Sequence, residues 1–169
     1  GQNGRTIAME DPSEGEKNGL TYIGPCLESH TPFDLLIIML GSNDCKSKLG
    51  LSAMDIGGEV QIFLEKVMAY DHFRCNDSFK VLLVSPPHIT DAIMNSWLGE
   101  NFGFEYAIGR SEKLASWFRQ LADMYHCYFL DAAEYVQASD ADGCHMDAEG
   151  QKKLGQVIAE YIQKEIFPE

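Results

Sequence analysis

The chain has 169 residues, of which 45% are apolar, which is enough for one domain with a buried core. Its 26 acidic residues outnumber its 13 basic ones, and the formal net charge of −13 disfavours binding to nucleic acids or to an anionic membrane surface. The longest apolar run, 35–40, is far shorter than the ~20 residues that span a bilayer. We therefore expect one globular domain over 1–169, with neither a nucleic-acid nor a membrane partner.

The cysteines predict a reducing environment. They are five in number, an odd count, and no two of them form a C-x-x-C pair. This pattern is typical neither of a disulfide framework nor of a zinc module, so free thiols, a cytoplasmic location and no metal are expected. The cysteines are Cys26, Cys45, Cys75, Cys127 and Cys144.

The first 33 residues are rich in Gly, Asn, Pro, Asp and Glu. This composition predicts a loop with turns over 1–22 and a short helix or turn over 24–30. Three later segments have the continuous apolar character of parallel strands that are covered on both faces: 34–40, 80–85 and 127–130. Pro86 and Pro87 end the second of them.

Apolar stripes at helical spacing predict three amphipathic helices that pack on a core. Ser52 and Asp55 form a capping box before the first, and Asp147 is the expected N-cap of the last. The stripes are Ile56, Val60, Phe63 and Val67; Leu114, Trp117, Phe118, Leu121 and Tyr125; and Leu154, Val157, Ile158, Tyr161, Ile162 and Ile166.

A long loop is expected over 88–105. Trp97, Phe102 and Phe104 within it fit two interpretations: they line an apolar pocket, or they pack under the loop without contacting a ligand.

Strands that alternate with helices predict a parallel sheet with helices on both faces, whose functional loops follow the carboxyl ends of the strands. Two polar segments follow such ends, 41–44 and 142–145, so we expect them at one edge of the sheet. In the second segment, His145 can accept a proton from a hydroxyl nucleophile while Asp142 fixes the tautomer of its ring.

Two other chemistries use the same histidine. Cys144 and His145 could form a thiol hydrolase, but adjacent loop residues tend to point in different directions. A metal-dependent hydrolase needs three clustered ligands, and only Asp142, His145 and Asp147 approach that number. The remaining histidines are expected at the surface or in packing contacts: His30, His72, His88 and His126.

Taken together, the chain resembles the SGNH (GDSL-type) hydrolase family, in its small arylesterase and acyltransferase branch. The segment 1–6, Gly-Gln-Asn-Gly-Arg-Thr, resembles the second of the four family blocks. Gly-Ser-Asn-Asp at 41–44 resembles the third, and Asp-Gly-Cys-His at 142–145 resembles the last. The first block, a Gly-Asp-Ser that carries the nucleophilic serine, is absent from these residues.

The resemblance implies a three-layer α/β/α sandwich with a flavodoxin-like parallel sheet of five strands in the order 2-1-3-4-5. The segments 34–40, 80–85 and 127–130 would be strands 3, 4 and 5. We therefore expect the domain to be N-terminally incomplete, with strands 1 and 2 and the serine supplied by a segment that precedes Gly1. Ser42 and Ser85 do not lie in a nucleophile elbow. On this interpretation the chain alone is inactive.

The resemblance also assigns roles. His145 would be the general base and Asp142 would orient it, while Gly4 and Asn43 would form the oxyanion hole. Asp44 would be structural at the site. The substrate-binding residues would be Trp97, Phe102 and Pro87.

The function that the resemblance implies is a serine esterase that acts on small acyl or aryl esters through an acyl-enzyme, without a cofactor. Hydrolysis and acyl transfer to alcohols are both left open. Carbohydrate O-acetyl esterase and lipase or thioesterase are alternatives on the same fold. A non-catalytic ligand-binding relative is an alternative of another class. A homo-oligomer is left open.

Overall fold

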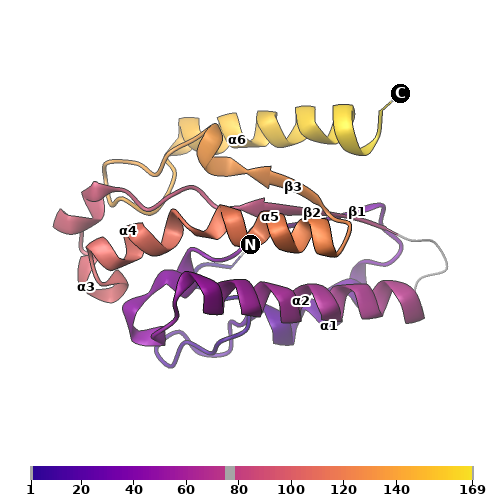
Figure 1. The fold of residues 1–169 in the computed structure, drawn as a ribbon, viewed down its shortest axis with the longest axis horizontal. Coiled ribbons are helices and arrows are strands. Elements are labelled where there is room, and N and C mark those ends of the chain that lie inside the picture. The colour runs from indigo at the N-terminus through magenta and orange to yellow at the C-terminus, as the bar shows by residue number, and fades with distance from the viewer. Residues whose placement is uncertain (1, 75–78, 169) are drawn as a thin grey trace.

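The structure, a computed structural model, describes residues 2–74 and 79–168, without the side chains of 71–74. Its three strands are β1 (Leu35–Ile38), β2 (Lys80–Ser85) and β3 (Tyr128–Asp131). They form a parallel sheet in the order β1-β2-β3 (Figure 1). The predicted parallel α/β architecture is confirmed, and β2 has the predicted bounds.

The helices connect and cover these strands (Figure 1). They are α1 (Gly19–His30), α2 (Ala53–Arg74), α3 (Gly99–Phe102), α4 (Glu105–Ser111), α5 (Leu114–Met124) and α6 (Ala148–Tyr161). A π-helical turn, Ile162–Ile166, continues α6. Short 3-10 turns occur at η1 (Asn43–Cys45), η2 (Ser47–Leu49), η3 (Asp91–Asn95) and η4 (Ala132–Glu134).

Alternate residues of β2 face two hydrophobic cores, one on each side of the sheet. Val81 and Leu83 belong to the larger core, which also includes buried residues of α1, α2 and α5. Leu82 and Val84 belong to the smaller core, to which α6 contributes Leu154. The sheet is therefore covered by α6 on one face and by α1, α2 and α5 on the other (Figure 1).

The predicted helix starts are confirmed by their hydrogen bonds. The Ser52 N–H donates to Asp55 Oδ2 (2.8 Å) and the Asp55 N–H donates to Ser52 Oγ (3.2 Å), which is a reciprocal capping box ahead of α2. Asp147 Oδ1 accepts the N–H of Gly150 (2.7 Å) at the start of α6.

The prediction of a loop over 1–22 is wrong in its last part, because α1 begins at Gly19. The side chain of Asn18 caps the helix by accepting the N–H of Thr21 (2.7 Å). The N–H groups of Gly19 and Leu20 donate to the carbonyls of Thr6 and Ile7. The bonds to Thr6 and Ile7 come from residues 13 positions away in the sequence, and local composition does not reveal such contacts.

The prediction of one long loop over 88–105 is also wrong, since this stretch contains η3, α3 and the start of α4. Tertiary packing holds these short helices. A Cβ atom on Gly99 would lie 2.5 Å from the ring of Phe104, and Gly103 ends α3 with φ +79°. Helices this short lack a stability of their own, so their sequences carry little helical signal.

β1 forms one edge of the sheet. Within residues 2–74 and 79–168, its only strand partner is β2. Ile37 and, just beyond the strand, Met39 are 43% and 39% exposed, unusual values for apolar residues of a parallel sheet. The sheet therefore presents an apolar, unpaired edge at β1.

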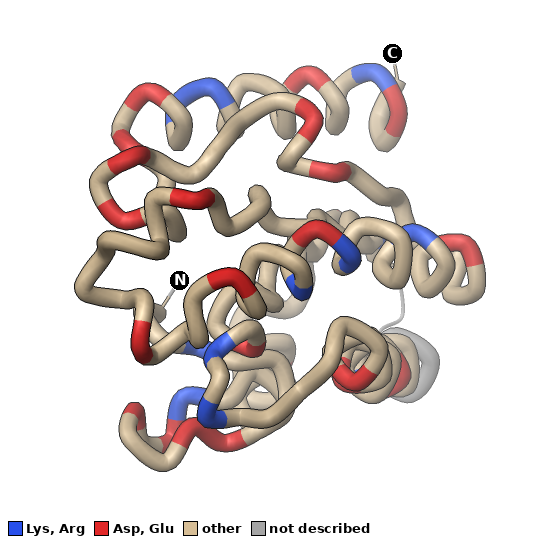
Figure 2. The backbone as a smooth tube through the Cα atoms, turned by 60° about the vertical axis from the view of Figure 1, so that its left-hand side comes forward, with Lys and Arg blue, Asp and Glu red and all other residues tan. Residues whose placement is uncertain are grey.

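Basic and acidic residues are interspersed along the part of the backbone that the structure describes (Figure 2). None of the helices within the described ranges combines the length and apolarity that crossing a bilayer requires. The four described cysteines are free thiols, and Cys75 lies outside the described residues.

Candidate active site

The turn at 142–145 places an imidazole against a carboxylate. His145 Nδ1 lies 2.7 Å from Asp142 Oδ2, and Asp142 Oδ1 accepts the N–H groups of Cys144 (2.9 Å) and His145 (2.8 Å). Burial alone would raise the pKa of Asp142, but these two N–H donors and the imidazole outweigh it and lower the pKa. Asp142 is therefore held as a carboxylate whose second oxygen is committed to the histidine ring.

The imidazole remains open on its other side. The His145 side chain is 57% exposed, whereas that of Asp142 is 14% exposed. Within the described part of the chain, Nε2 has no hydrogen-bond partner. A ring whose Nδ1–H is held by a carboxylate has its free lone pair on Nε2, which is the arrangement that a general base requires.

Gly143 makes this turn possible. Its φ of +74° is a left-handed conformation, and a Cβ atom there would lie 2.3 Å from the backbone N of Ile93. Its carbonyl accepts the N–H of Thr90 (2.9 Å), and its own N–H donates to the carbonyl of Ser139 (2.9 Å). The turn is thus packed tightly against the loop that follows β2.

We expect Gly143→Ala to lower the free energy of unfolding by about 2 kcal/mol or more, and Tm by about 5 °C or more. The methyl group would combine backbone strain with a collision against backbone atoms that cannot rotate away. Thermal denaturation of the purified protein measures the effect. Gly155→Ala is the matched control, because Gly155 lies in α6 with no atom within 4 Å of the added methyl. Equal Tm values for the two variants would contradict the expectation.

The segment that follows β1 reaches the segment 5–8. Asn43 Nδ2 donates to the carbonyl of Arg5 (3.1 Å), and Asp44 Oδ1 accepts the N–H of Ile7 (2.8 Å). The structure thus brings the second and third predicted blocks into direct contact. Asn43 is half-buried at this junction, and Asp44 is fully buried.

Gly4 is buried, has φ +79° and lies close to the carboxylate of Glu14. A Cβ atom on Gly4 would lie 2.7 Å from Glu14 Oε2. Glu14 is paired with Lys17 (2.6 Å) and Lys46 (3.3 Å), and Lys46 also contacts the buried Asp11 (2.9 Å). These cations lower the pKa of Glu14, and the network fixes the loop above Gly4.

The turn at 142–145 and the segment 41–46 lie at the same edge of the sheet. The segment 41–46 follows β1, the carbonyl of Gly143 accepts the N–H of Thr90 beyond the end of β2, and Cys144 packs against the core that contains Cys45. The two polar segments therefore lie at one edge of the sheet, and a shared role of Asn43 and His145 in one site stays a prediction.

A thiol mechanism is disfavoured by the surroundings of Cys144. Burial, and then the charge of Asp142, raise the pKa of Cys144 to about 11. A reactive thiol needs a lowered pKa, so this sulfur is a packing group.

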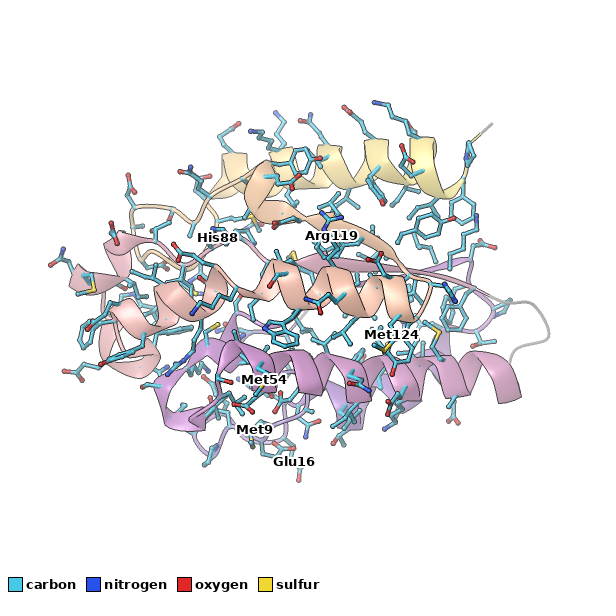
Figure 3. The ribbon with its side chains drawn as sticks, viewed as in Figure 1. Met9, Glu16, Met54, His88, Arg119 and Met124 are labelled. Atoms are coloured by element: carbon cyan, nitrogen blue, oxygen red, sulfur yellow. The ribbon has the colours of Figure 1, made fainter. Side chains whose placement is uncertain are left out.

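The residues expected to bind substrate occupy different environments. Trp97 is 80% exposed, Phe102 is 2% exposed within the larger core, and Pro87 is buried after β2. Their role in substrate binding stays a prediction. In the same region, His88 and Thr90 contribute to a cavity of about 290 Å³, and Figure 3 shows His88 beyond the carboxyl end of β2.

Sequence analysis missed Glu59. This residue is on α2, is 9% exposed, and accepts the N–H of Ala8 through Oε2 (3.2 Å). A signal was present: Glu59 lies three residues after Ile56 and four before Phe63, so it shares the core-facing side of the helix. An acid at such a position needs a partner.

Solved structures share this architecture. Est24, a carbohydrate acetylesterase from Sinorhizobium meliloti, is 31% identical with a TM-score of 0.86, over 94% of this chain and 74% of that protein. An aryl esterase from M. smegmatis is 29% identical with a TM-score of 0.87, over 95% of this chain and 74% of that protein. A carbohydrate acetylesterase family member from S. meliloti is 28% identical with a TM-score of 0.84, over 96% of this chain and 76% of that protein.

No protein-family model and no curated protein matches the chain. The fold, the site and the structural relatives nevertheless define its class, which is that of hydrolases built on a parallel α/β sheet. The chain belongs to the SGNH (GDSL-type) hydrolase family.

Proposed function

We propose that this protein is a serine esterase that cleaves small acyl or aryl esters through a covalent acyl-enzyme. The observation that carries the proposal is the Asp142–His145 pair, with Nδ1 held at 2.7 Å from the carboxylate and Nε2 open to solvent. The junction of Asn43 with the segment that follows Gly4, at the same edge of the sheet, supports it.

In the first half-reaction, Nε2 of His145 takes the proton of a serine hydroxyl as its oxygen attacks the ester carbonyl carbon. Asp142 stabilises the imidazolium that results, and it remains a carboxylate because its pKa is lowered. The tetrahedral intermediate then collapses, and the imidazolium gives its proton to the departing alcohol. An acyl-serine remains.

In the second half-reaction, water gives a proton to His145 and attacks the acyl carbon, and the serine leaves with that proton as the acid is released. An alcohol in place of water gives acyl transfer. The Asn43 amide and the N–H of Gly4 are the proposed donors to the oxyanion in both steps. The ion pairs of Lys46 with Asp11 and Glu14 support the loop beside Gly4, so the donor is positioned before the reaction begins.

We propose that the serine comes from a segment that precedes Gly1. The apolar edge of β1, with Ile37 and Met39 exposed, supports a further parallel strand at that position. β1, β2 and β3 would then be strands 3, 4 and 5 of a five-stranded sheet in the order 2-1-3-4-5. The chain spans about three quarters of the length of its structural relatives, which leaves room for such a segment.

The acyl group is proposed to be small. One relative is named an aryl esterase and two are named carbohydrate acetylesterases, so acetyl esters of sugars are a second candidate substrate class. Comparing p-nitrophenyl acetate with acetylated xylose as substrates of one preparation separates the two, because each assay reports acetate release from a different alcohol.

We expect the complete protein, with its serine segment, to hydrolyse p-nitrophenyl acetate. A fluorophosphonate probe should inactivate it by labelling one serine. Peptide mass mapping should place that label on a residue before Gly1. A label on Ser42 or Ser85 would refute the proposed position of the nucleophile, and absence of ester hydrolysis would refute the function.

A further inference from the structure

The backbone from Arg5 to Ala8, which follows the proposed oxyanion donor Gly4, is held at nearly every polar group. The carbonyls of Thr6 and Ile7 accept N–H groups from the start of α1. Asn43 Nδ2 binds the carbonyl of Arg5 at 3.1 Å. The N–H of Arg5 donates to the carbonyl of Gln2 (3.3 Å), and the N–H groups of Ile7 and Ala8 are bound by two acids that come from different elements.

Asp44 and Glu59 are those acids. Asp44 Oδ1 lies 2.8 Å from the N of Ile7, and Glu59 Oε2 lies 3.2 Å from the N of Ala8. Asp44 is 0% exposed and Glu59 is 9% exposed. Figure 3 shows Met9, just after this segment, beside the first turns of α2, where Met54 lies. Two consecutive amides are thus anchored from η1 and from α2.

The two carboxyl groups also meet each other. Asp44 Oδ2 is buried and has no hydrogen-bond partner among the residues that the structure describes, and the Glu59 carboxyl is near enough to raise the pKa of Asp44. Two carboxylates in contact repel unless one of them holds a proton. Burial is the main cause that raises the pKa of Asp44, Glu59 raises it further, and the N–H of Ile7 opposes them.

We propose that Glu59 is a positioning residue of the oxyanion hole: together with Asp44 it fixes the Ile7 and Ala8 amides and thereby the Gly4 loop. This inference rests on the proposed esterase function for its catalytic consequence. Glu59 touches neither the ester nor the nucleophile. Its effect is to hold the Gly4 N–H where the charge of the intermediate develops, and a small misplacement there lowers the rate steeply.

The central experiment replaces Glu59 in the complete protein in two ways. Glu59→Ala removes the acceptor of the Ala8 N–H and the partner of Asp44. We expect its kcat for p-nitrophenyl acetate to fall by about 10- to 100-fold, with a change in KM of less than about threefold. Glu59→Gln should restore kcat to within about threefold of wild type, because its amide oxygen can accept from Ala8 while its NH₂ donates to Asp44 Oδ2.

Glu65→Ala is the matched control. Glu65 is an exposed acid on the same helix whose Oε1 accepts the hydroxyl of Tyr125 (2.9 Å), so the same substitution removes a contact without reaching the site. We expect its kcat to equal that of wild type. A Glu59→Ala enzyme that remains folded and matches Glu65→Ala in kcat would overturn the inference and leave the esterase proposal standing.

A second measurement does not depend on activity. Amide hydrogen exchange of Ala8 should accelerate by about tenfold or more in Glu59→Ala and return toward the wild-type rate in Glu59→Gln. The amide of Leu83, in β2, is the internal reference. If wild type does not cleave esters, the function fails while this exchange pattern still supports the loop anchor. Unchanged exchange at Ala8 would overturn the anchor itself.

Discussion

Replacing His145 by alanine in the complete protein is expected to lower kcat for p-nitrophenyl acetate by about 10³- to 10⁶-fold. The imidazole is the one group at this edge of the sheet with a nitrogen open to solvent and an opposite nitrogen fixed by a carboxylate, among the residues that the structure describes. Without it, the serine hydroxyl keeps its proton and remains a weak nucleophile. Stopped assays at high enzyme concentration measure the residual rate.

His30→Ala provides the comparison for that loss. His30 is an exposed histidine at the end of α1 whose Nδ1 contacts Cys26 O (2.9 Å), and its removal should leave kcat unchanged. KM of the His145 variant should change little, because the imidazole accepts the proton of the nucleophile and does not bind the substrate. A His145 variant that kept the wild-type rate would remove this residue from the mechanism.

The parts of the fold that the sequence predicted are those that local patterns encode. β2 was placed at its correct bounds because a continuous apolar run ends at two prolines that cannot extend a ladder. The start of α2 was placed because Ser52 and Asp55 cap it through side chains three residues apart. Each of these signals lies within a short stretch of neighbouring residues.

The parts that were missed depend on contacts between distant segments. β1 is shorter than the apolar run around it, because its pairing with β2 ends where Ile38 lies opposite Leu83. The apolar character of a residue does not indicate whether its backbone is paired with another strand. α3 and α4 are held by packing such as that of Gly99 against Phe104, which appears in the sequence only as a loop-like composition.

The residues of the candidate site also fall into two groups: those that local spacing predicts and those that depend on contacts between distant segments. Asp142 and His145 were found because the pair spans a single turn of chain, so its spacing is visible in the sequence. The Ala8–Glu59 bond joins residues 51 positions apart, and no spacing rule points to it. The resemblance to a known family supplied Gly4 and Asn43, but it carried no information about the acid beneath them. Long-range polar contacts of this kind are the part of an active site that only a structure reveals.

Asp142→Asn is expected to lower kcat by about 10³- to 10⁴-fold while leaving the turn intact. The hydrogen bonds of Asp142 explain why the exchange of one carboxyl oxygen for an amide NH₂ lowers kcat so strongly. Oδ1 of Asp142 accepts two backbone N–H groups, from Cys144 and His145, so the amide oxygen of asparagine must occupy that position. The NH₂ group then faces His145 Nδ1, which becomes an acceptor, and the ring proton moves to Nε2, where it blocks proton transfer from the serine. Thermal denaturation should show nearly the wild-type Tm, and Asp140→Asn, in the same loop, should keep full activity. An Asp142→Asn enzyme of normal rate would mean that this carboxylate does not set the tautomer of the base.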